Sequence, residues 1–155
     1  MCFSWASITI YTNHSWENMK ASVEWVNGLT YLAWGDSRHY TIVDYSDDKD
    51  KQKGSSPTEL MLQSMLACTA PDIVSILKKM KEPIQGLVVN AVGTRATEHP
   101  KVFTDIEIEY IVRGNVKQES LDKAIALSQE KYCHISITFK RAGVNIKVSS
   151  KIIKE

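Results

Sequence analysis

Two cysteines, Cys68 and Cys133, are the residues of this chain with the clearest capacity for chemistry. Cys68 lies in the segment LACTAP, and Cys133 lies 65 residues further along, between Tyr132 and His134. A thiolate that attacks a peroxide becomes a sulfenic acid, and a second thiol then converts that acid into a disulfide. The pair could run such a cycle if the fold brings the sulfurs together. Taken alone, each cysteine also fits a small buried apolar residue, which is what most helical cysteines are.

The other candidates for chemistry are weaker. Cys2 lies near the chain start, and we interpret it as incidental. The four histidines (14, 39, 99 and 134) lack metal-ligand spacing, so we expect no metal site. Asp47, Asp48 and Asp50 alternate with lysines, which indicates a solvated loop rather than a calcium site. Neither glycine-rich phosphate-binding motif occurs, and we expect no cofactor.

Composition restricts the class of protein. The 155 residues, 43% of them hydrophobic, suffice for one compact core. A net charge of +1 argues against a nucleic-acid-binding surface and against an electrostatic membrane anchor. No run approaches the roughly 18 apolar residues of a membrane-spanning helix, and residues 1–18 do not read as a signal peptide. We therefore expect a cytoplasmic protein that binds neither nucleic acid nor membrane.

The elements that must position the cysteines predict an α+β fold with largely antiparallel sheet. Asn27-Gly28 predicts a hairpin turn, and residues 46–54 predict a loop. The predicted strands are 20–26, 29–34, 39–45, 84–97, 102–112, 135–141 and 144–153, with a second helix over 117–132. Residues 1–18 form an extension, either an ordered arm or a tail, and Met19 is an alternative start. Residues 19–155 are expected to form a single domain.

The first helix has a strong start signal at Ser56-Pro57-Thr58-Glu59. Ser56 suits the N-cap, Pro57 the first helical position, and Glu59 completes a capping box. A helical stripe of mostly apolar residues then runs to Met80, through positions 62, 65, 66, 69, 73, 76 and 77. Pro71 lacks an N–H, so we expect it to kink or break this helix.

These two cysteine segments resemble a known family. GSSPTELMLQSMLACTAPDIVSILKKM looks like the central helix of the osmotically inducible protein C and organic hydroperoxide resistance (OsmC/Ohr) family. SLDKAIALSQEKYCHIS looks like that family's second cysteine helix, and the likeness covers about residues 19–153. It is nearest to the two-cysteine OsmC-like branch. The resemblance implies an OsmC-like fold, mostly antiparallel sheets around two helices, and an intertwined homodimer with two sites at the subunit interface.

The resemblance also implies roles for individual residues. Cys68 would be the peroxidatic cysteine and Cys133 the resolving one. A dithiol reductant of the lipoyl type would reduce the disulfide between them. Glu59 would pair with an arginine of the N-terminal strands, where Arg38 is the candidate. Arg95, in the predicted strand after the first helix, is a second candidate cation. The alternatives are that Glu59 only caps the helix and that Arg38 is a solvated strand-edge residue. Glu59 and Cys68, nine residues apart, lie on opposite helix faces, so a site with Glu59 would need the other subunit's cysteines.

Two functional hypotheses follow. In the first, the protein is a thiol-dependent peroxidase for organic hydroperoxides, with hydrogen peroxide as a second candidate substrate. Met61, Met65 and Leu66 would bind the apolar body of the substrate. In the second, it is a redox-sensing or ligand-binding dimer with little peroxidase activity. The poor match of the sequence around Arg38 to the peroxidase motif favours the second.

Overall fold

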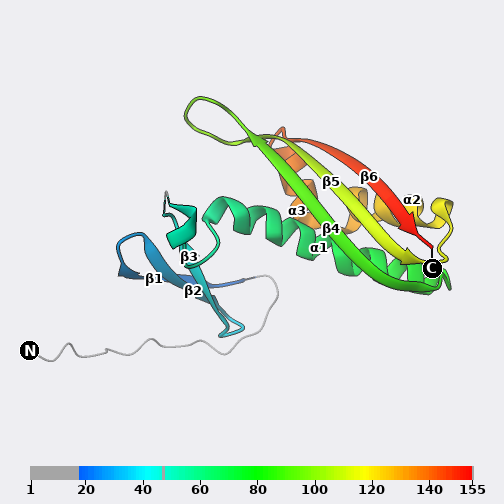
Figure 1. Ribbon diagram of the computed structural model, residues 1–155, viewed down its shortest axis with the longest axis horizontal. Helices are drawn as coiled ribbons and strands as arrows, with labels where there is room; N and C mark the ends of the chain where they lie inside the picture. The colour runs from blue at the N-terminus through cyan, green and yellow to red at the C-terminus, as the bar shows by residue number, and fades with distance from the viewer. Residues whose placement is uncertain (1–17, 47, 155) are drawn as a thin grey trace, which may run out of the picture. The chain divides into compact units, whose positions relative to one another are not determined.

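The chain divides into two compact units, with the boundary between Pro57 and Thr58. A computed structural model describes residues 18–46 and 48–154 (Figure 1). The described elements are six strands, a short 3-10 helix, three α-helices and a π-helical turn. The α+β prediction is therefore confirmed. The interpretations of Cys2, of Asp47 and of residues 1–17 lie outside the described residues.

The first unit contains an antiparallel sheet of three consecutive strands, β1 (Ala21–Asn27), β2 (Thr30–Gly35) and β3 (Tyr40–Asp44). The predicted hairpin joins β1 to β2, with Asn27 paired to Thr30. Its turn lies one residue later than expected, since Gly28 has φ +52° and Asn27 has no positive φ. Glycine suits this left-handed conformation because it has no Cβ.

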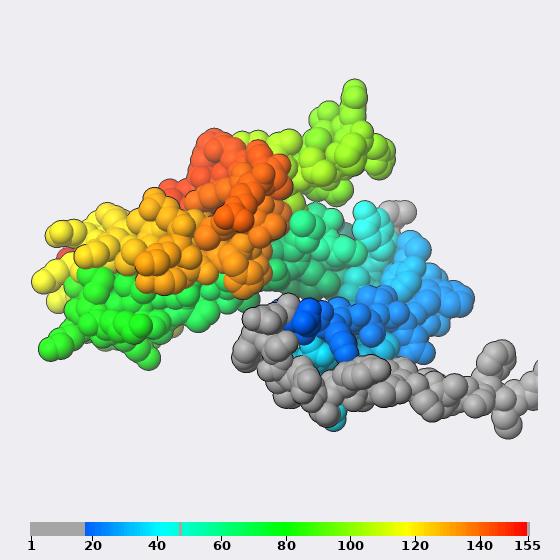
Figure 2. Space-filling view, turned by 180° about the vertical axis from the view of Figure 1, so that it is seen from behind, coloured from blue at the N-terminus to red at the C-terminus, as the bar shows by residue number. Residues whose placement is uncertain are grey.

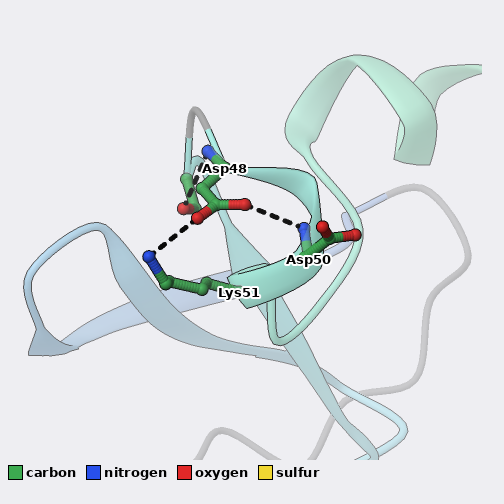
Figure 3. Close-up of polar contacts among 4 residues, drawn as sticks. Asp48, Asp50 and Lys51 are labelled. Carbon is green, nitrogen blue, oxygen red and sulfur yellow. Dashed lines mark hydrogen bonds and ion pairs between the residues drawn. The ribbon is translucent and has the colours of Figure 1, made fainter.

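The segment after β3 is a loop that contains one 3-10 turn, Lys49–Lys51. The Asp48 carboxylate accepts a hydrogen bond from the Asp50 N–H at 3.1 Å and forms an ion pair with Lys51 Nζ at 2.8 Å (Figure 3). Asp48 therefore caps this turn. The predicted loop is present, with more local structure than its charged sequence suggested.

The long helix α1 (Pro57–Lys79) begins at the predicted proline. The expected break at Pro71 is wrong, because α1 continues through it. Met65, Ile73 and Leu77 are fully buried on both sides of the proline. Packing of one apolar face over this length offsets a missing backbone hydrogen bond.

Length and composition alone would allow α1 to cross a membrane, and no other described helix meets this test. The search for long apolar runs in the sequence did not anticipate it. Core helices of soluble proteins pass the same test, and Met65, Ile73 and Leu77 of α1 belong to the core.

The sheet of the second unit has the order β4 (Ile84–Arg95), β5 (Phe103–Gly114) and β6 (Asn145–Ile153) (Figure 1). β4 and β5 are antiparallel, whereas β5 and β6 are parallel. One face of β5 is buried, and it carries Ile106, Ile108, Tyr110 and Val112. The alternation of buried and exposed residues shows that helices cover only this face.

Three helical pieces connect β5 to β6: α2 (Gln118–Leu127), a π-helical turn (Ser128–Tyr132) and α3 (His134–Arg141). The predicted strand over 135–141 is therefore wrong. Gly143 has φ +86°, its N–H donates to Lys140 O, and the Val144 N–H donates to Phe139 O. These bonds form a helix C-terminal Schellman motif. The helical connection explains the parallel pairing of β6, which a tight turn could not produce.

Candidate active site

Cys68 and Cys133 meet inside the second unit. Cys68 lies in the middle of α1 and is partly buried, whereas Cys133 lies between the π-helical turn and α3 and has no exposed surface. The carbonyl oxygen of Met65, one turn before Cys68 on α1, lies 3.9 Å from Cys133 Sγ, and the Cys133 thiol is close enough to raise the pKa of Cys68. Both cysteines are free thiols. Figure 2 shows α2 (yellow) and α3 (orange) lying along α1 (green), the arrangement that brings the two segments together.

The N-terminus of α3 faces both sulfurs. Cys133 is its N-cap, and the sulfur accepts the Ser136 N–H at 3.4 Å. The same thiol lies 3.2 Å from the Ser136 hydroxyl, to which it donates. The Ile135 N–H is hydrogen-bonded to Cys68. Unpaired N–H groups of a first helical turn stabilise negative charge, so the Ile135 N–H favours the thiolate form of Cys68.

The remaining surroundings of Cys68 favour the protonated thiol. Burial and the hydrogen bond with Cys133 raise the pKa of Cys68 from 9.0 to about 11, and the charges of Cys133 and Asp72 act in the same direction. Only the Ile135 N–H lowers this pKa among the main influences. No cation is among those influences within the described residues. Cys68 is therefore protonated at neutral pH and needs a base before it can attack.

The π-helical turn sets the position of Cys133. The Cys133 N–H donates to Ser128 O at 2.8 Å, the five-residue spacing of a π-turn. This register directs the buried Ser128 and Gln129 toward α1 and β5, where both have hydrogen-bond partners. Single π-turns within helices are frequent at functional sites.

A buried chain of hydrogen bonds links these elements. Ser128 Oγ donates to Asp72 at 2.9 Å and must therefore accept from Thr69 Oγ1 at 2.8 Å. Thr69 in turn accepts from the Tyr110 hydroxyl at 2.8 Å, and Tyr110 accepts from Gln129 Nε2 at 2.8 Å. Burial raises the pKa of Tyr110 against the opposing bonds from Thr69 and Gln129, so it stays a donor. Gln129 Oε1 has no partner among the described residues.

His134 is a neighbour of Cys68 that the sequence analysis considered only as a metal ligand. Its Nδ1 lies 3.7 Å from Cys68 Sγ, although the residues are 66 positions apart. The described residues contain no group of three side chains that could hold a metal ion. His134, Thr69 and Ser128 are thus residues of the site that sequence reasoning missed. Only the adjacency of His134 to Cys133 gave a signal.

The other residues predicted for the site lie in different surroundings. Glu59 is exposed in the first turn of α1. Arg38 belongs to the first unit, in the turn between β2 and β3, with φ +59° and its N–H bonded to Gly35 O. Arg95 donates its Nε to Lys101 O at 2.7 Å, which ties it to the β4–β5 connection.

The three residues predicted to bind substrate differ in exposure. Met61 is 49% exposed and Leu66 is partly buried against the core. Met65 is fully buried, and its carbonyl oxygen lies 3.9 Å from Cys133 Sγ. Its side chain is thus a core residue within this unit, unlike those of Met61 and Leu66.

Comparisons with known proteins identify the family. The model of the OsmC-like protein family matches residues 48–149, which include both cysteines. The chain belongs to the OsmC-like protein family. The resemblance inferred from the two cysteine segments is confirmed at this level. Protein YhfA of Escherichia coli K12 is 35% identical over 136 residues, covering 87% of this chain and 98% of that protein.

Solved structures share the OsmC-like fold. A hypothetical protein from Aquifex aeolicus VF5 is similar at a TM-score of 0.80 and 29% identity, over 90% of this chain and 98% of that one. The organic hydroperoxide resistance protein OhrB of Bacillus subtilis is similar at a TM-score of 0.62 and 16% identity, over 86% and 98% of the two chains. The latter likeness establishes the fold alone.

Proposed function

We propose that this OsmC-like protein is a cysteine-based peroxidase that reduces organic hydroperoxides through a Cys68–Cys133 disulfide cycle. The proximity of the two thiols, contributed by helical segments 65 residues apart, carries the proposal. Membership of a family that includes organic hydroperoxide resistance proteins supports it. Cys68 is the better peroxidatic candidate because it is partly exposed, whereas the buried Cys133 suits resolution.

The proposed cycle has three steps. The Cys68 thiolate attacks a peroxide oxygen, the O–O bond breaks, and the alcohol leaves with a proton while Cys68 becomes a sulfenic acid. The Cys133 sulfur then attacks Cys68, a disulfide forms, and water leaves. A dithiol reductant, such as a lipoyl group, restores both thiols and is itself oxidised to a disulfide.

We further propose a cytoplasmic, intertwined homodimer of the two-cysteine branch. Glu59 and Arg38 would act at a site that the second subunit completes, since Glu59 and Cys68 point from opposite faces of α1. Met61 and Leu66 would contact the apolar body of the peroxide. An apolar hydroperoxide is favoured over hydrogen peroxide because the residues flanking Cys68 on α1 are mostly apolar.

Stopped-flow mixing with cumene hydroperoxide tests the proposal. The wild-type protein is expected to lose two thiols per peroxide within the first turnover, and Cys68→Ser to lose none rapidly. Cys133→Ser is expected to complete one turnover and then to accumulate Cys68 with two added oxygen atoms, because the sulfenic acid has no resolving partner. Cys2→Ser is the matched control and is expected to behave as wild type.

A slow thiol loss in the wild type, at the rate of an ordinary cysteine, would favour the alternative function. That alternative is a redox-sensing or ligand-binding dimer with little peroxidase activity. The raised pKa of Cys68 is the observation that favours it. Normal cycling of Cys133→Ser with a dithiol would instead remove Cys133 from the resolving role.

A further inference from the structure

The His134 ring is the ionisable side chain of α3 that contacts Cys68. The distance from His134 Nδ1 to Cys68 Sγ is 3.7 Å, within hydrogen-bonding range for sulfur. His134 is exposed, so its ring can exchange protons with water. Its carbonyl oxygen accepts the Thr138 hydroxyl at 2.8 Å, a bond that ties the first turn of α3 together.

Cys68 needs such a neighbour. The titratable groups that act on it are Cys133 at the start of α3, Asp72 one turn later on α1, and His134 in direct contact. The first two oppose a negative charge on the sulfur. The Ile135 N–H favours that charge but cannot accept a proton. Histidine can, because the ordinary pKa of its ring is about 6.5.

We propose that His134 is the general base that removes the proton of Cys68 and then returns it to the leaving oxygen. The proposal rests on the peroxidase function above. The proton moves from Sγ to Nδ1 and creates a thiolate beside an imidazolium, the arrangement by which a base activates a nucleophilic cysteine. When the O–O bond breaks, the imidazolium protonates the alkoxide, so alcohol leaves and neutral His134 remains beside the Cys68 sulfenic acid.

The pH dependence of Cys68 alkylation tests this assignment without any peroxide. Iodoacetamide reacts with the thiolate, and peptide mass spectrometry reports Cys68 separately from the other two cysteines. The alkylation rate of wild-type Cys68 is expected to rise first at about pH 6.5, near the ordinary histidine pKa, and again at the higher pH where the thiol itself ionises. The first rise is the lower limb of the pH profile. His134→Gln is expected to lose this lower limb and to react about 10²-fold more slowly at pH 7.

Two further variants make the result decisive. His99→Gln removes a histidine of the β4–β5 connection and is expected to keep the wild-type profile. Retention of the lower limb in His134→Gln, or its loss in Arg38→Gln instead, overturns the assignment. If the alkylation profile is as expected but peroxide does not react rapidly, the peroxidase proposal is refuted, whereas the assignment of His134 as the base of Cys68 stands.

Discussion

Thr69 is a polar residue in the middle of the apolar face of α1. It lies one turn from Met65 on one side and from Ile73 on the other, and all three are fully buried. Its hydroxyl bridges Tyr110 of β5 and Ser128 of the π-helical turn. One hydroxyl therefore connects the helix of the first cysteine to the turn that precedes the second.

Thr69→Val is expected to lower the free energy of unfolding by about 1–3 kcal/mol, because it leaves buried hydroxyls short of a partner while keeping the shape of the side chain. Urea unfolding measures the effect. Thr104→Val is the matched control, since Thr104 is exposed and its hydroxyl bonds to Thr94 O and Asp105 lie at the surface. Its change is expected to stay within about 0.5 kcal/mol. Equal losses in the two variants would contradict a linking role for Thr69.

The sequence could identify the cysteines because their residue type and flanking segments carry the information. It could not identify the contact between Cys68 and His134, nor that between Thr69 and Tyr110. These pairs are 66 and 41 residues apart. Residue type alone does not say which distant side chains meet, and a threonine in a helical stripe looks the same whether or not it has a partner.

The main difference between the predicted and the observed elements of the second unit arises from the signals that begin and end α3. Ile135, Ile137 and Phe139 suggested a strand because β-branched and aromatic residues favour sheets. The N-cap of Cys133 and the Schellman motif at Gly143 outweigh that preference and produce α3. The Ala142-Gly143 pair, which separates the predicted strands 135–141 and 144–153, is equally a helix stop signal. The strands of the second unit before α2 were predicted well because β5 alternates regularly.

The start of α2 is capped from a distant part of the chain. Lys117, at the N-cap, provides no side-chain cap. Glu82, which precedes β4, accepts the Lys117 N–H at 3.0 Å and the Ser120 hydroxyl at 2.6 Å. These two bonds lower the pKa of Glu82 below 4.5, with the Ser120 bond the larger cause. A carboxylate at a helix N-terminus also interacts favourably with the helix dipole.

Glu82→Gln is expected to destabilise the protein at pH 7, since a neutral amide is a weaker cap. A carboxyl whose pKa is lower in the folded state contributes fully above its unfolded pKa and loses that contribution as pH falls through the folded value. The difference from wild type should therefore shrink as pH falls below 4.5. Urea midpoints at pH 7 and at pH 4 test this. The exposed Glu98→Gln is the control, and a difference independent of pH would refute the ionised cap.

At the scale of the molecule, the two units differ in how completely they bury their own apolar side chains. β5 has a buried face, but every residue of β1 is exposed. The exposed large apolar side chains of the first sheet include Val23 at 64%, Trp25 at 66% and Tyr40 at 65%. A small sheet with such a surface needs a further apolar partner in water. The sequence predicted these strands, but its alternation did not reveal how exposed they are.

A second copy of the chain is the partner that the proposed homodimer supplies. Sedimentation equilibrium at micromolar concentration is expected to give twice the chain mass of 17.5 kDa. Val23→Glu is expected to shift the population toward monomer and to lower the thermal midpoint, because it places a charge on a surface that the proposed dimer would bury. Val102→Glu is the matched control, since Val102 is 58% exposed in the β4–β5 connection. A well-folded wild-type monomer at this concentration would exclude an intertwined dimer, and with it any site that needs Glu59 from a second subunit.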